Sequence, residues 1–198
     1  MTKGRLEAFS DGVIAIIITI MVLELKVPHM ADLEGLRHLA PTFASYALSF
    51  VFVGIYWNNH HHLFQVVRHV NGAVLWANLA LLFFLSLVPF GTAWLGESGF
   101  QSLPVALYGV IFLLSAVAHF ILSRALVRAH PEHAVLKEAL GDDLKGNLSL
   151  ALYLAAIPLA FFVPVASCAL YVTVAIIWLV PDRRIERKLA ASPHAPHE

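Results

Sequence analysis

Polar side chains that could carry proton or ion chemistry gather in two short stretches of this apolar chain. Ser10 and Asp11 stand directly before residues 12–23, which carry no charge, and residues 56–64 read YWNNHHHLF. An ionised side chain at the centre of a membrane span costs at least ~2.5 kcal/mol, so Asp11 should have a partner. The candidate partners in the sequence are Arg5, Trp57, Asn58, Asn59, His60, His61, His62 and Asn78.

Three interpretations of this polar cluster stay open. The first is a structural lock between helices, because buried polar groups normally satisfy one another. The second is a proton or ion relay, since histidine titrates near neutral pH. The third, a metal site, is disfavoured because adjacent histidines on a helix point about 100° apart. The sequence shows no H-x-x-x-H pair there, so we predict no metal, and we interpret the isolated His119 as a satisfied packing residue.

The composition indicates a membrane protein. Hydrophobic residues make up 59% of the 198 residues and charged residues only 13%, whereas a soluble domain is nearer one quarter charged. The formal net charge of zero gives no indication of a nucleic-acid partner. The sequence contains no nucleophile paired with a base, no phosphate-binding loop and no metal-hydrolase spacing, so we expect neither an enzyme nor a cofactor.

The apolar segments predict an all-α fold with six transmembrane helices. A span needs about 20 mostly apolar residues. Pro28 should end the first span, Pro89 should kink the third, and the long uncharged stretch 146–181 is divided at Pro164. The predicted spans are residues 6–27, 42–67, 73–95, 104–127, 147–163 and 165–180.

The distribution of basic residues predicts the orientation, because cytoplasmic segments collect lysine and arginine. With both termini inside, only Lys26 and Arg37 lie outside. We therefore expect a multi-pass plasma-membrane protein with cytoplasmic ends, a polar connection over residues 29–41 and a disordered tail over residues 185–198. The inner side would hold Lys3, Arg5, Arg68, Arg124, Arg128, Lys137, Lys145, Arg183, Arg184, Arg187 and Lys188.

The first span presents two different faces. At about 100° per residue, Asp11 lies about 140° from Ile16. The face that contains Ile16 is apolar except for one hydroxyl group. Its members are Ile16, Thr19, Ile20 and Leu23. Periodicity alone does not decide whether this face meets lipid, a protein core or a pore.

The start of the first span carries the motif Arg-x-x-x-Phe-Ser-Asp, formed by Arg5, Phe9, Ser10 and Asp11. This motif, followed by an isoleucine-rich span, resembles the signature of the transmembrane protein 175 potassium channel family. The chain is similar to the short prokaryotic members, which have one six-helix unit, here residues 1–184. Under the predicted topology the motif meets the inner ends of the second and third spans, which predicts an interhelical polar network. Its members are Arg5, Phe9, Ser10, Asp11, Trp57, Asn58, His60, His61 and Asn78.

The same resemblance implies a homotetramer in which the first helix lines a central pore for K⁺ and other monovalent cations. The matching pore positions are Ile16, Thr19, Ile20 and Leu23, and no TVGYG-type filter occurs. Apolar rings would form the constriction, and one hydroxyl layer would give modest K⁺ selectivity. Glu24 would stand at the outer mouth and concentrate cations, or would be a surface carboxylate beside Lys26.

Two other functions remain alternatives to a potassium-permeable channel. One is a proton-coupled or metal ion carrier that uses His60–His62 together with Asp11. The other is a membrane scaffold that conducts nothing.

Overall fold

The protein is all-α in the computed structural model, which describes residues 2–28, 31–65, 67, 69–130 and 144–179. The predicted tail over residues 185–198 therefore lies outside the described residues, as does most of the charged stretch between residues 128 and 145. The described part of the chain contains no strand, which agrees with the predicted fold class. Its helices are α1 (Lys3–Leu23), α2 (Leu33–Gln65), α3 (Gly72–Ser86), α4 (Val88–Glu97), α5 (Ser102–Ala129), α7 (Leu144–Leu159) and α8 (Pro164–Leu179).

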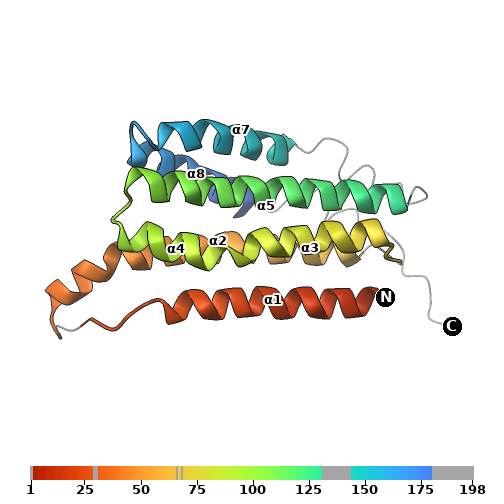
Figure 1. Ribbon diagram of the computed structural model, residues 1–198, viewed down its shortest axis with the longest axis horizontal. Helices are drawn as coiled ribbons and strands as arrows, with labels where there is room; N and C mark the ends of the chain where they lie inside the picture. The colour runs from red at the N-terminus through yellow and green to blue at the C-terminus, as the bar shows by residue number, and fades with distance from the viewer. Residues whose placement is uncertain (1, 29–30, 66, 68, 131–143, 180–198) are drawn as a thin grey trace.

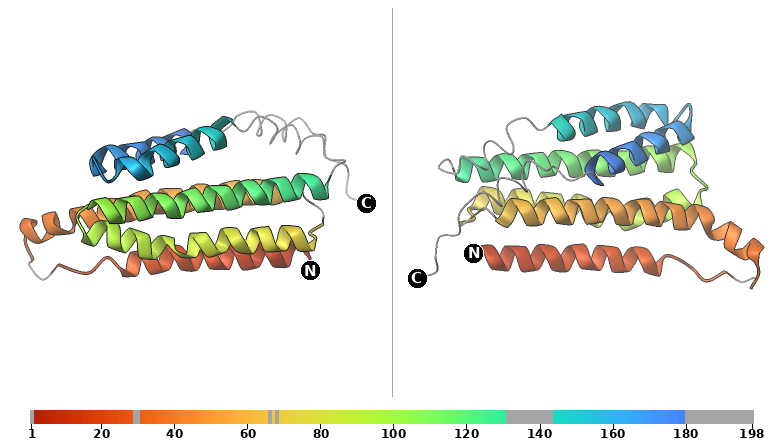
Figure 2. Two further views of the ribbon diagram at one scale, coloured as in Figure 1. Left: turned by 45° about the horizontal axis from the view of Figure 1, so that its top comes forward. Right: turned by 180° about the vertical axis from the view of Figure 1, so that it is seen from behind.

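The helices lie roughly parallel to one long axis, with α1 at one edge of the bundle and α7 at the other (Figure 1). The helix α1 packs against α2, α3 and α4, while α5 packs against α3, α4, α7 and α8. The views in Figure 2 also place α1 at the edge, with one side facing away from the rest of the chain. One side of α1 is therefore left uncovered by the rest of the described chain.

Four helical segments are long and apolar enough to cross a membrane, and two shorter apolar helices follow. The four are Lys3–Leu23, Leu33–Gln65, Gly72–Glu97 and Ser102–Ala129. The two shorter helices are α7 and α8, each of 16 residues. These six apolar segments occur in the predicted order.

Proline residues lie at two of the expected breaks, whereas α1 ends at Leu23, before Pro28. The helix α3 ends at Ser86, and α4 begins at Val88 with Pro89 in its first turn. The helix α8 begins at Pro164, the residue chosen to divide the last uncharged stretch. A proline can start a helix without loss because the first N–H groups have no intrahelical partner.

The start of α2 differs from the expected polar connection over residues 29–41. The helix begins at Leu33 and continues through Pro41. The Asp32 carboxylate accepts a 2.9 Å hydrogen bond from the backbone N–H of Gly35, which caps the new helix start. Figure 1 shows this first part of α2 bending away from the rest of the helix.

The interior of the bundle is rich in aromatic rings. The ring centroids of Phe52 on α2 and Phe112 on α5 are 4.4 Å apart. Those of Tyr108 on α5 and Tyr171 on α8 are 5.6 Å apart. Such pairs bury large areas and favour tilted or edge-on contacts. This core joins α2 and α5 to α7 and α8, so the helices that support α1 are themselves held by aromatic packing.

Candidate functional site

The helix α1 turns one apolar face into its own subunit and another away from it. The buried residues recur every three or four positions, and they are Leu6, Ser10, Ile14, Ile17 and Met21. On the other side Ile16 is 59% exposed, Ile20 43% and Leu23 73%. These three residues and Thr19 share one face by helical spacing. The structure thus exposes together the four residues that the sequence grouped.

Thr19 presents an oxygen on this exposed face. Its hydroxyl group donates a 2.9 Å hydrogen bond to the backbone carbonyl of Ala15. Because the proton points back to the helix, the oxygen keeps acceptor capacity toward the open side. The apolar face is therefore interrupted by one acceptor oxygen.

Under the buried face of α1, three polar side chains from three helices meet. The Asn78 side-chain nitrogen donates to Ser10 Oγ at 2.9 Å, and the Asn78 side-chain oxygen lies 2.8 Å from His60 Nε2. The Ser10 hydroxyl donates in turn to the Leu6 carbonyl. All three polar residues are at most 2% exposed. The cluster joins α1, α2 and α3 at a single point.

Asp11 has a different partner from its neighbour Ser10. The Trp57 indole nitrogen donates a 3.0 Å hydrogen bond to the Asp11 carboxylate, and both residues are exposed in the single chain. The Trp57 ring also stacks on His61 at 5.8 Å. Among the described residues the carboxylate bonds to no histidine. Of the partners that the sequence offered for Asp11, the structure shows a hydrogen bond from the Trp57 indole.

Three residues of the expected network make no polar or ring contact through their side chains with the described residues. They are Arg5, Phe9 and Asn58, and all three are exposed. Phe9 is 51% exposed. It precedes Ile16 by seven positions, so it continues the open face of α1 rather than the polar cluster.

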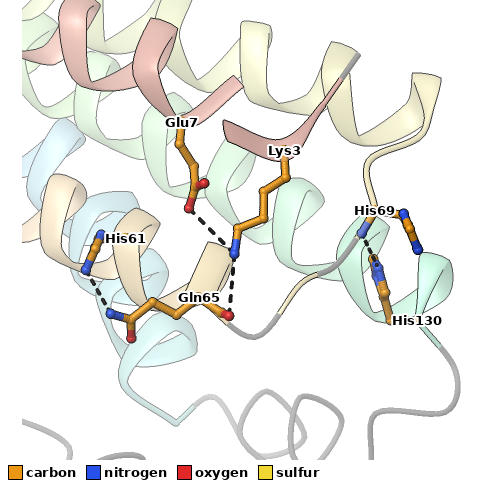
Figure 3. A network of polar contacts seen from close by, with 6 residues as sticks. All are labelled: Lys3, Glu7, His61, Gln65, His69 and His130. Atoms are coloured by element: carbon orange, nitrogen blue, oxygen red, sulfur yellow. Dashed lines mark hydrogen bonds and ion pairs between the residues drawn. The ribbon is translucent and has the colours of Figure 1, made fainter. Parts of the chain in front are cut away.

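A second polar chain at the end of the bundle was missed by the sequence interpretation. Figure 3 shows Lys3 between Glu7 and the backbone of Gln65, and Gln65 in turn beside His61. The Lys3 ammonium lies 3.9 Å from Glu7 and 3.5 Å from the Gln65 carbonyl oxygen. The Gln65 amide lies 2.9 Å from His61 Nε2. The i,i+4 spacing of Lys3 and Glu7 was the available signal.

The same view shows His69, in the segment before α3, beside His130 at the end of α5 (Figure 3). The backbone N–H of His69 donates to His130 Nε2 at 3.4 Å. This contact ties the segment before α3 to the last turn of α5.

At the opposite end, Lys26 forms an ion pair with Glu97, with 3.0 Å between nitrogen and oxygen. The hydrogen bond and the charge of Glu97 raise the pKa of Lys26, and the negative charge of Glu24 adds to this. Glu24 itself is exposed, directly after the open face of α1. Lys26 thus pairs with Glu97 at the end of α4 rather than with Glu24.

The described residues contain no group of three or more His, Cys, Asp and Glu side chains placed to hold a metal ion. His119 packs edge-on against Tyr56 at 6.1 Å. Its Nδ1 is shielded and has no hydrogen-bond partner in the described part of the chain, as is also true of His62 Nδ1. His119 therefore packs inside the bundle, as expected. The expectation that its hydrogen-bonding groups are all satisfied was wrong, because its Nδ1 has no partner among the described residues.

Comparisons with known proteins show what the chain as a whole is similar to. The family model described as "Endosomal/lysosomal potassium channel TMEM175" matches residues 5–89. A potassium channel of Chryseobacterium sp. (strain P1-3) is 54% identical over 189 residues, which cover 96% of this chain and 98% of that protein. The human endosomal/lysosomal proton channel TMEM175 is 36% identical over 101 residues, which cover 45% of this chain and 20% of the human protein.

A solved structure gives the same assignment. The crystal structure of a lysosomal potassium-selective channel TMEM175 homologue from Chamaesiphon minutus matches with a TM-score of 0.75 and 32% identity, covering 90% of this chain and 96% of that chain. The bacterial relative matches along nearly its whole length, and the family model begins at Arg5, the first residue of the Arg-x-x-x-Phe-Ser-Asp motif. The chain therefore belongs to the TMEM175 family.

Proposed function

We propose that this chain forms a potassium-permeable cation channel, as a homotetramer in the plasma membrane with cytoplasmic termini. Residues 1–184 would be the six-helix channel unit. The observation that carries the proposal is the open face of α1, where Ile16, Ile20 and Leu23 are exposed on a helix that its own subunit covers on one side only. In a family of potassium channels, a shared axis is the natural place for this face. A pore lined by one helix type requires several copies of the chain.

The proposed permeation path follows from the residues on this face. Rings of Ile16, Ile20 and Leu23 would narrow the path and close it by dewetting when it is too narrow for water. The ring of Thr19 would offer one layer of oxygen atoms to a partly dehydrated cation. A weakly hydrated ion such as K⁺ loses less than Na⁺ at such a layer, so selectivity should be modest. Bound K⁺ ions in the pore are the only ligands that the proposal requires.

The known relatives are ion channels rather than enzymes, in keeping with the expectation for this chain. The contacts of these residues do not support the alternative of a carrier that uses His60–His62 and Asp11. His60 is held by Asn78 and Asp11 by Trp57, so neither is a free ligand. The cluster fits the interpretation as a lock between helices better than a transport site.

A flux assay with a matched pair of variants tests the pore assignment. Ile16 is 59% exposed on α1 and Ile176 is 56% exposed on α8, so both present the same side chain to a similar degree. In vesicles with a potassium gradient, Ile16→Ala and Leu23→Ala should change K⁺ flux or the K⁺/Na⁺ ratio. Ile176→Ala should leave both as in the wild type. Equal effects of Ile16→Ala and Ile176→Ala would contradict the proposed pore.

The same vesicles distinguish a channel from a carrier. Because the human relative is named a proton channel, a pH-sensitive dye inside the vesicles should be read together with K⁺ flux. We expect K⁺ flux that rises without saturation at millimolar K⁺ and needs no pH gradient. Saturable flux that requires a pH gradient and is lost in His60→Ala would favour the carrier.

A further inference from the structure

A groove runs between α3 and α5 at the end of the bundle that holds the N-terminus of α1. It is a partly open groove with a volume of about 430 Å³. The two helices pack closely against each other along their lengths. The residues that line the groove are Asn71, Ala73, Ala77, Phe120, Ile121, Arg124, Ala125, Arg128 and Ala129. The alanines leave the space, because a methyl side chain cannot fill the width between two helices.

The groove carries positive charge that no carboxylate among the described residues pairs with. Arg124 and Arg128 lie four positions apart on α5, so their side chains share one face. Neither arginine forms an ion pair with a described carboxylate, and none of the lining residues is acidic. Arg124 lies over the Phe120 ring at 4.8 Å, which fixes its guanidinium at the wall of the groove. The site is thus a cationic one.

The N-terminus of α3 adds to the positive potential that the two arginines produce in the groove. Asn71 caps the helix by accepting a 3.0 Å hydrogen bond from the backbone N–H of Val74. The first N–H groups of a helix have no intrahelical partner and carry a partial positive charge. Gly72 begins α3 directly beside Asn71 and Ala73, both of which line the groove. An anion held by the arginines would therefore also meet the positive end of α3.

The groove changes from polar to apolar along α5. Phe120 and Ile121 precede Arg128 by about two helical turns, which corresponds to about 12 Å along the axis. Ile121 is 52% exposed, as an acyl chain in the bilayer requires. Basic pockets between transmembrane helices on the cytoplasmic side are suited to anionic headgroups. A phospholipid matches this arrangement, because its charged headgroup can meet the arginines and its acyl chain the apolar residues. A free anion would contact only the end of the groove that holds the arginines.

We propose that the groove between α3 and α5 binds an anionic phospholipid of the leaflet facing the N-terminus. The phosphate of the headgroup lies between Arg124 and Arg128, beside the start of α3. One acyl chain runs along Phe120 and Ile121. This inference concerns lipid binding and does not depend on the ion that the chain conducts.

Native mass spectrometry of the detergent-purified full chain, titrated with phosphatidylglycerol or phosphatidylcholine, tests the proposal. The wild type should bind phosphatidylglycerol more tightly than phosphatidylcholine. Arg124→Gln/Arg128→Gln should weaken phosphatidylglycerol binding by about 30-fold, taking about 1 kcal/mol for each basic residue. Arg5→Gln removes a positive charge at the same end but outside the groove, and should keep wild-type binding. An equal loss in Arg5→Gln would overturn the proposal in favour of general surface charge.

A second pair of variants tests the groove itself while keeping both arginines. Ala73→Trp should fill the groove and weaken phosphatidylglycerol binding, whereas Leu79→Trp, at an exposed position on a different face of α3, should not. Thermal unfolding of each variant in detergent shows whether it is folded. Inorganic phosphate at millimolar concentration should fail to displace the lipid. Displacement by phosphate, or unchanged binding in Ala73→Trp, would overturn the assignment of a lipid site.

Discussion

The side-chain nitrogen of Asn78 on α3 donates a 2.9 Å hydrogen bond to the buried hydroxyl of Ser10 on α1. The other side of the same amide meets His60 on α2, so one residue satisfies two buried groups at once. Buried polar groups left without a partner cost about 1–3 kcal/mol each. Asn78 therefore fixes the rotation of α1, which in turn decides which face of α1 is open.

Replacing this amide should destabilise the subunit. In Asn78→Leu, His60 loses its partner and the Ser10 oxygen loses its donor, although the Ser10 hydroxyl keeps its bond to the Leu6 carbonyl. The free energy of unfolding should therefore fall by about 1–3 kcal/mol. Denaturant unfolding of the detergent-solubilised protein measures the loss. Asn58→Leu is the matched control, because the Asn58 side chain is exposed and makes no polar contact with the described residues. A wild-type stability of Asn78→Leu would contradict the role of the cluster.

The hydrogen bond between Trp57 and Asp11 predicts a coupled pair of variants. Trp57→Phe removes the donor, and Asp11→Ala removes the acceptor, so each should lower the yield of assembled protein. Because both act through one hydrogen bond, the double variant should lose about as much as either alone. The amount of oligomer on size-exclusion chromatography is the readout. Strictly additive losses would show that the two residues act separately.

The sequence located the first helix and its open face, but it did not rank the polar residues within the motif. Ser10 and Asp11 are neighbours, so they point about 100° apart, and only the packing of α1 against α3 decides which is buried. The sequence favoured Asp11 as the centre of the network because a charge most needs a partner. The structure buries the hydroxyl and leaves the carboxylate exposed beside Trp57.

Other differences have equally local causes. Pro41 suggested the end of a connection, yet α2 contains it, since Asp32 caps an earlier helix start. The spacing of Asp32 and Gly35 was a readable N-cap signal. The contact of Lys3 with the carbonyl of Gln65 had no such signal, because it joins residues 62 positions apart through a backbone atom. Long-range contacts of this kind depend on tertiary packing.

Gly109 on α5 predicts a steric effect at the interface with α8. A Cβ atom at this position would collide with the Tyr171 hydroxyl group. That hydroxyl donates a 3.1 Å hydrogen bond to the Val105 carbonyl and cannot move freely. Gly109→Ala should therefore destabilise the protein by about 1–3 kcal/mol. The thermal midpoint in detergent measures the effect.

Two further variants make this prediction specific. A methyl group added at Gly54 on α2 would meet no atom within 4 Å apart from its chain neighbours and the nearby backbone of its own helix, so Gly54→Ala should be neutral or slightly stabilising. Removing the colliding oxygen in Gly109→Ala/Tyr171→Phe should recover part of the lost stability. A Gly109→Ala protein as stable as the wild type would show that α5 and α8 can separate at low cost.

The ion pair between Lys26 and Glu97 predicts a dependence on pH. Glu97 raises the pKa of Lys26, so the contribution of the pair is complete below the ordinary lysine pKa of 10.5 and is lost as pH rises through the raised value. Glu97→Gln should lower the thermal midpoint slightly at neutral pH and low salt. The difference should vanish at high salt or above that pKa, because the pair is exposed. A difference that persists at high salt would contradict this account.

Glu24 predicts a change in conductance rather than in stability. It is exposed directly after the open face of α1, and the nearby Lys26 is paired with Glu97. A carboxylate at a pore mouth raises the local concentration of cations. Glu24→Gln should therefore lower single-channel K⁺ current at about 10 mM salt and have little effect at about 1 M, where the Debye length is only ~3 Å. Glu34→Gln is the control, since Glu34 lies in the first turn of α2 and pairs with Arg37. If the two variants lowered the current equally, Glu24 would be a surface carboxylate and the outer end of α1 would not border the pore.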